Sequence, residues 1–188
     1  MSSVLKVNTI KNSTGTTAMS IDGTGNTTIS QKLLTPTRPA FRVAKTNSDQ
    51  SITSGQSSKV TFNNVVFEVG GTNIGTTDKF VAPVAGLYRF DACVRVGPDT
   101  NNASFYNAVV FLKKNNNLHV YLQQISTYAN NLGGGTAHLS MCNLNGGVTT
   151  SLAANDEIEV WVTLEGSSPE VKSGGDSDFT YFSGFLIG

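Results

Sequence analysis

The sequence predicts an all-β protein, built mainly as a two-layered β-sandwich or jelly roll. Short runs of alternating or β-branched apolar residues recur at intervals of about 8 to 12 residues, as they do in such folds. Gly, Asn, Asp and Ser, which favour turns, separate these runs. No stretch repeats its apolar residues with the 3.6-residue period of an amphipathic helix.

The chain is neutral and poor in charge. Among its 188 residues, 13 Lys and Arg balance 13 Asp and Glu, and charged residues make up 14%. Zero net charge argues against a nucleic-acid partner and against binding to anionic membranes. No apolar run approaches the roughly 18 residues of a membrane span, so we expect no membrane insertion. Cys93 and Cys142 are too few for a disulfide scaffold and are expected to be buried free thiols.

Residues 1–30 are predicted to form a separate β-rich segment, joined by a linker at residues 31–38 to a domain at residues 39–188. Pro36 and Pro39 favour extended backbone around the linker. The segment contains too few apolar residues for its own core, and so short a sheet is marginal alone. It is therefore expected to pack on sister chains or on a larger particle, the alternative being a disordered tail. Its predicted strands are Val4–Ile10, Ala18–Ile21 and Thr27–Ile29, with turns at Asn12–Gly15 and Asp22–Asn26.

Short strands and polar loops alternate through the rest of the chain. The predicted strands are Ala40–Ala44, Lys59–Phe62, Val65–Val69, Phe105–Lys113, Leu118–Leu122, Thr136–Cys142, Val148–Ala153, Asp156–Leu164 and Phe179–Ile187. The predicted loops are Asn47–Ser58, Gly70–Asp78, Gly97–Asn102, Gln123–Gly135 and Glu165–Asp178. Asn115–Asn117 predicts a hairpin tip, because Asn tolerates left-handed backbone, and Asn145–Gly147 predicts a second turn.

The stretch from Phe80 to Val96 organises this pattern. Its apolar run breaks at Pro83, which cannot donate to a ladder, and turns at Gly86. In the strand that follows, every second residue from Tyr88 to Val96 is apolar. We therefore expect Tyr88 and Phe90 to face the core. The opposite face would carry Arg89, Asp91, Cys93 and Arg95.

Three motifs of this domain resemble the complement C1q-like domain, a jelly roll of the tumour-necrosis-factor superfamily. They are Phe80-x-x-Pro83-x-x-Gly86-x-Tyr88-x-Phe90, the final Phe182-Ser183-Gly184-Phe185-Leu186-Ile187 and the early Pro39-Ala40-Phe41-Arg42-Val43. The resemblance covers residues 39–188. It implies a compact homotrimer that uses exposed loops for binding and has no catalytic chemistry.

Residues 1–30 resemble the N-terminal segments of phage virion fibres. The resemblance rests on Leu5-Lys6-Val7-Asn8-Thr9-Ile10 and on Ile21-Asp22-Gly23-x-Gly25-Asn26. It implies a virion protein assembled in the cytoplasm of a bacterial host, which agrees with the lack of a signal-peptide pattern after Met1. The segment would then bind other virion proteins.

The predicted subunit interface lies on the outward face of the central strand. A lone charge buried there is costly, whereas a paired one is tolerated, so Arg89 and Asp91 are expected to pair near the three-fold axis, within or between chains. Cys93 shares this face. On the last strand Phe185 and Ile187 oppose Phe182, Gly184 and Leu186 in parity, so one set is expected in the core and the other at the contact. The alternative is that the whole face is solvated.

Catalytic chemistry is not expected. His119 and His138 fit no triad or zinc spacing, and no cofactor motif is present. Glu157 and Glu159 are expected on a solvated sheet face. Asp176 and Asp178 are weak candidates for calcium, because the rest of a coordination set is missing.

These observations favour a phage fibre or appendage tip whose outward loops bind a glycan or envelope protein of the host surface. Tyr128 suits sugar stacking and the neighbouring Asn residues suit hydrogen bonding; plain solvated turns are the alternative. A capsid or tail decoration or cement protein is the alternative function, and a depolymerase a further one. The predicted receptor-binding residues are Asp99, Asn101, Asn102, Tyr128, Asn130 and Asn131.

Overall fold

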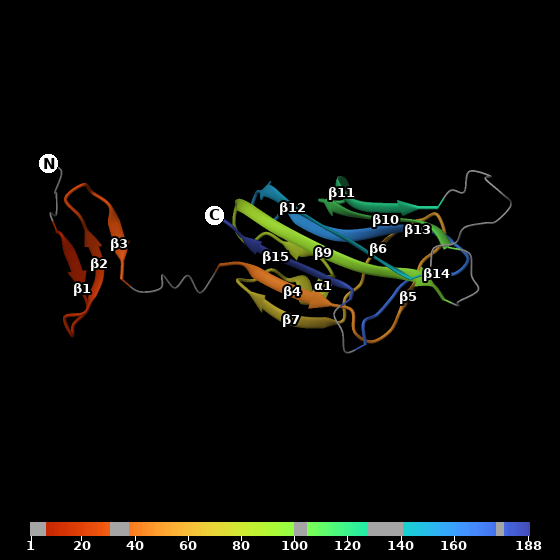
Figure 1. Cartoon of the computed structure of the whole chain (residues 1–188), viewed down its shortest axis with the longest axis horizontal. Helices are drawn as coiled ribbons and strands as arrows, with labels where there is room; N and C mark the ends of the chain where they lie inside the picture. Colours follow the sequence, from red (N-terminus) through yellow and green to blue (C-terminus); the bar gives the residue numbers. More distant parts are fainter. Residues whose placement is uncertain (1–6, 31–37, 100–104, 128–140, 176–178) are drawn as a thin grey trace. The chain divides into compact units, whose positions relative to one another are not determined.

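The fold is described from a computed structural model, in residues 7–30, 38–99, 105–127, 141–175 and 179–188. The chain divides into two compact units, Met1–Pro36 and Thr37–Gly188 (Figure 1). Most of the predicted linker lies outside the described residues, so the finer division at residues 31–38 stays a prediction.

In the N-terminal unit, the described residues form an antiparallel sheet of three short strands, β1 (Thr9–Lys11), β2 (Thr17–Ile21) and β3 (Thr27–Ile29). The register places Met19 between Ile10 and Ile29. Both isoleucines are 46% exposed. A single sheet of this size has no opposing layer to cover such residues.

Two side chains hold the turns of this sheet. Asn12 Oδ1 accepts hydrogen bonds from the backbone nitrogens of Thr14, at 3.1 Å, and Thr16, at 2.9 Å. Ten positions later, Asp22 Oδ1 accepts equivalent bonds from Thr24 and Asn26, both at 2.9 Å. Side-chain donors from the same two residues hold the pKa of the Asp22 carboxyl well below its ordinary value. The two turns are therefore built on the same Asx geometry.

The second unit is a jelly roll of two antiparallel sheets, as the sequence predicted (Figure 1). Within the described residues, the seven-stranded sheet contains β4 (Ala40–Ala44), β5 (Gln50–Ser51), β7 (Asn64–Val69), β9 (Gly86–Pro98), β12 (Cys142–Leu152), β14 (Pro169–Val171) and β15 (Tyr181–Leu186). The five-stranded sheet contains β6 (Ser57–Lys59), β8 (Phe80–Val81), β10 (Phe105–Lys114), β11 (Asn117–Ser126) and β13 (Glu157–Gly166). We call them the first and the second sheet.

An aromatic cluster fills the space between the sheets. Tyr88 and Phe90 are fully buried, which confirms the predicted parity of β9. The Phe80 ring lies edge-on to both, at centroid distances of 5.2 and 5.0 Å. Phe41 and Phe182 complete the cluster with centroids 4.9 Å apart. The Tyr88 hydroxyl donates to the carbonyl of Val84 at 2.8 Å, so its polar end is satisfied.

Gly184 on β15 makes room for these rings. A Cβ there would lie 2.6 Å from Phe90 and 2.8 Å from Phe41, both ring carbons. Phe182 and Gly184 face the core, whereas Phe185 is 49% exposed on the other side. The predicted alternation of the last strand is therefore confirmed.

Some predicted elements are wrong. Asn145–Gly147 is no turn, because all three residues lie inside β12 and pair with β9. The strand predicted at Lys59–Phe62 is observed as β6, which ends at Lys59; the Val60 nitrogen still donates to the carbonyl of Val160 at 2.9 Å. The predicted loops contain β5, β14 and residues 123–126 of β11. Of the strand predicted at Thr136–Cys142, the described residues include only Met141 and Cys142, where β12 begins.

A single helical turn, α1 (Ile74–Thr77), lies within the predicted loop Gly70–Asp78. Asn73 and Asp78 flank it with φ of 56° and 52°. Such backbone is more accessible to Asn and Asp than to most residues, and so short an element leaves no helical period in the sequence. In the described part of the chain, no helix is long and apolar enough to cross a membrane.

The predicted hairpin tip is confirmed between β10 and β11, where Asn115 and Asn116 have φ of 50° and 65°. Asp156, before β13, ties this tip to the turn after β12. It forms an ion pair with Lys114 at 2.7 Å and accepts from Asn115 Nδ2 at 2.7 Å. It also accepts from the backbone nitrogen of Ala153 at 2.8 Å. These partners lower the pKa of Asp156 from 3.8 to about 2.

We therefore expect Asp156→Asn to remove part of the acid sensitivity of the domain. The native pKa is lower than the ordinary one, so the carboxylate stabilises the fold above pH 3.8 and loses this effect as pH falls toward about 2. Urea unfolding between pH 5 and about 2 should show a shallower decline for Asp156→Asn than for the wild type. Asp99→Asn, an exposed control, should follow the wild type; equal slopes for all three proteins would contradict the assignment.

Candidate binding surfaces

The outward face of the first sheet carries the residues predicted for a subunit contact. Cross-strand pairing places Arg89 beside Phe185, which pairs in turn with Ala40 and, through it, with Val69 on β7. The next row runs from Asp91 through Ser183 and Arg42 to Phe67. We call this surface the Arg89 face.

An ion pair lies at the centre of the Arg89 face. Arg89 Nη2 is 2.6 Å from Asp91 Oδ1, and Arg89 Nε lies 3.0 Å from Asp91 Oδ2. The two side chains are 37% and 40% exposed. The Asp91 carboxylate raises the pKa of Arg89. An exposed pair contributes only about 0–1 kcal/mol to folding, but it leaves neither charge uncompensated if the face is covered.

Gly147 on β12 lies directly beside this ion pair. A Cβ at Gly147 would overlap Asp91 Oδ1 and Arg89 Nη2, and would lie 2.8 Å from the carbonyl oxygen of Phe90. The glycine is therefore required by a close approach within the sheet, which is why its interpretation as a turn residue is wrong. A depression of ≈ 420 Å³ lies next to the pair, bounded also by Cys93 and Tyr181.

Large apolar side chains lie on the same face as the ion pair, on the side of β15 and β7, and are exposed. Phe185 is 49% exposed and Phe67 46%. Exposed apolar residues scattered singly are ordinary, but a contiguous group marks a contact surface. The group comprises Phe67 and Val69 on β7, Leu87 on β9, and Phe185 and Ile187 at the end of the chain.

Both cysteines are free thiols, as predicted, but only half-buried. Cys93 lies two residues from Asp91 on the same face, and Cys142 begins β12. Burial raises the pKa of both thiols, so neither has the lowered pKa of a reactive cysteine.

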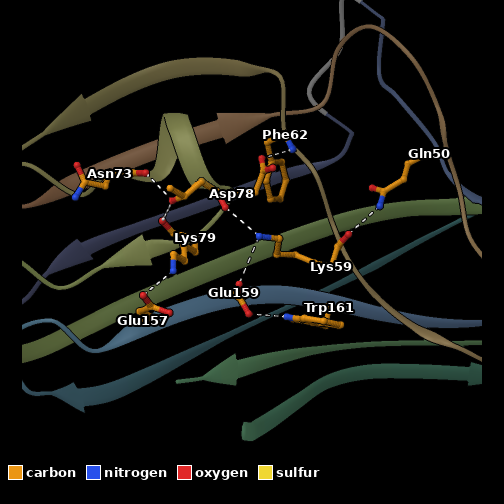
Figure 2. A network of polar contacts seen from close by, with 10 residues as sticks. Gln50, Lys59, Phe62, Asn73, Asp78, Lys79, Glu157, Glu159 and Trp161 are labelled. Atoms are coloured by element: carbon orange, nitrogen blue, oxygen red, sulfur yellow. Dashed lines mark hydrogen bonds and ion pairs between the residues drawn. The ribbon is translucent and has the colours of Figure 1, made fainter. Parts of the chain in front are cut away.

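A polar network lies on the second sheet, where it joins β6, α1 and β13 (Figure 2). Glu159 is 6% exposed and accepts from Trp161 Nε1 at 2.9 Å. Lys59 Nζ lies 3.5 Å from the Glu159 carboxylate and donates to the carbonyl of Thr77 at 3.0 Å. The prediction of a solvated face for Glu159 is therefore wrong, because Lys59 and Trp161 cover and satisfy it.

The same network anchors α1 against the sheet. Asp78 Oδ1 accepts from the backbone nitrogen of Phe62 at 2.7 Å, and Lys79 pairs with Glu157 at 2.6 Å (Figure 2). On the other side, Lys113 Nζ lies 3.5 Å from the centroid of the Trp161 ring. Trp161 is thus held from both sides, by a carboxylate and by a cation.

A family model described as the C1q domain matches residues 40–187. The chain belongs to the C1q domain family. This confirms the resemblance drawn from the Phe80–Phe90 motif and the two end strands.

Solved structures similar to this C1q domain include two of murine APRIL. A crystal structure at pH 8.0 is 14% identical, with 79% of this chain and 98% of that chain covered and a TM-score of 0.49. A second, at pH 8.5, has the same identity and coverage and a TM-score of 0.47. No curated protein sequence matches the chain.

Most of the predicted receptor-binding and calcium residues of the C1q domain lie outside the described residues. These are Asn101, Asn102, Tyr128, Asn130, Asn131, Asp176 and Asp178. Asp99 is described and exposed, and its backbone nitrogen donates to the carbonyl of Ser168 at 2.9 Å. In the part of the chain that is described, no three His, Cys, Asp or Glu side chains gather as a metal site.

We expect Gly147→Ala to destabilise the C1q domain by about 1–3 kcal/mol, because the added methyl group must displace the ion pair or the strand. Urea unfolding of Gly147→Ala, Asp91→Ala and the double variant would measure the coupling. The loss should be smaller in the Asp91→Ala background, where one clash is absent. Ser151→Ala on the same strand is the control, and strictly additive losses would contradict the role given to Asp91.

Proposed function

We propose that this C1q domain forms a homotrimer through the Arg89 face, and that the trimer is a phage virion component that binds the host cell surface. C1q domains typically form homotrimers and bind receptors, and are generally binding modules without catalysis. The proposal requires no cofactor. It assigns the subunit contact to Arg89, Asp91, Cys93 and Phe185.

One observation carries the proposed contact. On the Arg89 face an internally compensated ion pair shares one surface with exposed large apolar side chains, of which Phe185 is paired directly with Arg89. Burying apolar surface stabilises association by about 25 cal/mol per Å², and a pair already satisfied within its own chain can be covered without leaving an isolated charge. The face is therefore suited to burial against a second copy.

The virion role is supported by the N-terminal unit. Its sequence resembles phage fibre segments, and Ile10 and Ile29 lie exposed on a three-stranded sheet that is the one layer among the described residues of this unit. Such a unit gains stability when another protein covers these residues. We assign it to contacts with other virion proteins, and the C1q domain to the host surface.

If the Arg89 face forms the trimer contact, two variants should weaken the trimer. Asp91→Ala leaves Arg89 without its partner at the contact, and Phe185→Glu places a carboxylate among apolar side chains. Both should lower the trimer fraction in light scattering coupled to size-exclusion chromatography, and both should lower the melting temperature. Leu118→Glu, an exposed site of 51% on β11 of the other sheet, is the matched control.

Two results would overturn the assignment of the subunit contact to the Arg89 face. One is a wild-type chain that remains monomeric at micromolar concentration. The other is an Asp91→Ala variant that stays trimeric with unchanged melting. In either case the apolar residues of the Arg89 face would need another partner.

Host binding is tested separately. The labelled full-length chain should bind whole cells of a susceptible bacterium and compete with infection by the parent phage, because one trimer presents three sites and gains avidity. A trimer that binds virions but no cells would replace receptor binding with a decoration or cement role. Clearing of surface polysaccharide would instead indicate a depolymerase.

A further inference from the structure

A hollow of ≈ 330 Å³ opens on the outward face of the second sheet, away from the Arg89 face. Its size is at the lower end of the range for small-molecule sites. It combines aromatic rings with amides and hydroxyls. Its lining residues are Ser57 on β6, Asn107, Val109 and Phe111 on β10, Tyr121 and Gln124 on β11, and Thr163 and Glu165 on β13.

A β-bulge places two of these side chains together. Val110 pairs with Gln123, but Phe111 pairs with Tyr121, so Leu122 is the extra residue of β11. Without the bulge, Tyr121 and Gln124 would point to opposite faces, since they are three positions apart. With it, both line the hollow while Leu122 packs against the core. Bulges often re-aim side chains at binding sites in this way.

Asn107 supplies the buried polar group of the hollow. It is only 5% exposed, and its Oδ1 accepts from Gln124 Nε2 at 3.3 Å. Its Nδ2 has no acceptor among the described residues, where no fully buried side-chain nitrogen or oxygen lacks a partner. The Nδ2 group must therefore be open to the hollow. Gln124 Oε1 is likewise left to accept, so a donor and an acceptor lie side by side.

Aromatic rings form the neighbouring wall. Tyr121 is 63% exposed, with its ring 5.8 Å from that of Phe111 at an interplanar angle of 58°. Phe111 is held in turn beside Trp161, its partner on β13, which the Glu159 and Lys113 contacts immobilise. Tyr121 thus presents a supported apolar surface to solvent at the rim of a polar hollow.

We propose that this hollow binds a neutral hexopyranose unit of a saccharide. A pyranose offers an apolar C–H face to Tyr121 and adjacent hydroxyls that both donate and accept, matching Asn107 and Gln124. Ser57 and Thr163, whose hydroxyls lie 2.8 Å apart, add further partners. Among the described residues that line the hollow there is no Lys or Arg to bind a phosphate or an acidic sugar.

This inference rests on the proposed function, since it names the ligand class and the site through which the trimer would bind a host surface. The proposed receptor-binding site then lies on the outward face of the second sheet and not in the loops. The hollow shares no lining residue with the Arg89 face, and three weak sites on one trimer would act together on a repeating polysaccharide.

The full-length chain should be screened on an array of neutral, amino and acidic oligosaccharides, followed by calorimetric titration with the methyl glycoside of the best-bound sugar. We expect neutral glycans to bind. Tyr121→Ala and Gln124→Ala should each weaken binding by about tenfold or more. Leu118→Ala, on the same strand but outside the hollow, should bind as the wild type does, with all melting temperatures close to that of the parent.

Several outcomes would overturn the saccharide site. They are an array without any bound neutral glycan, binding unaffected by Tyr121→Ala, and cell binding that is lost after protease treatment but kept after periodate oxidation of surface glycans. The last would assign a protein ligand. Failure of the two proposals is distinguishable, because the Arg89 face is tested by oligomeric state and the hollow by the binding of monomeric methyl glycosides, which needs no avidity.

Discussion

The packing of five aromatic rings between two sheets is the constraint on which the rest of the C1q domain depends. Tyr88 and Phe90 can enter this cluster only if the even-numbered residues of this part of β9 point into the core. Phe182 imposes the same condition on β15. Because alternate residues point to opposite faces, the inward rings determine that Arg89, Asp91 and Phe185 point outward. The core thus specifies the composition of the outer surface, and Gly184 gives the rings the space to do so.

The two outer faces of the sandwich have different chemistry. The Arg89 face combines an internally paired Arg89 and Asp91 with Arg42 and several exposed large apolar side chains, which suits burial against another protein. The face of the second sheet carries amides, hydroxyls and a supported tyrosine, which suit a polar ligand in contact with water. A molecule with both features can assemble with one sheet and bind with the other, without a conflict between the two surfaces.

Regular alternation is the part of this structure that the sequence predicts well. The period of two along Tyr88 to Val96, and the Asn-rich tip at Asn115, depend on local chemistry and are visible in one dimension. The ion pair of Arg89 and Asp91 follows from the same parity. From these features, both the β-sandwich fold and the outward position of Arg89 and Asp91 could be predicted.

What the sequence did not reveal depends on residues distant in the chain. Gly146 and Gly147 resemble a turn until the neighbouring strands are known to approach them. The burial of Glu159 requires Lys59, about 100 positions earlier. The hollow needs a bulge at Leu122 that shifts the pairing of Tyr121, and no local signal marks it. The only sequence feature that points to the hollow is Tyr121, an aromatic residue close to Gln123 and Gln124 in β11.

The N-terminal unit has a modular construction. Each of its two turns is closed by one Asx side chain and a left-handed glycine, Gly15 in the first and Gly25 in the second, and the pattern recurs after ten residues. Every such block makes its hydrogen bonds within itself and with the strand next to it. Insertion or deletion of a whole block would lengthen or shorten the sheet by one strand and leave the remaining turns intact. The width of this sheet can therefore change in steps of one strand.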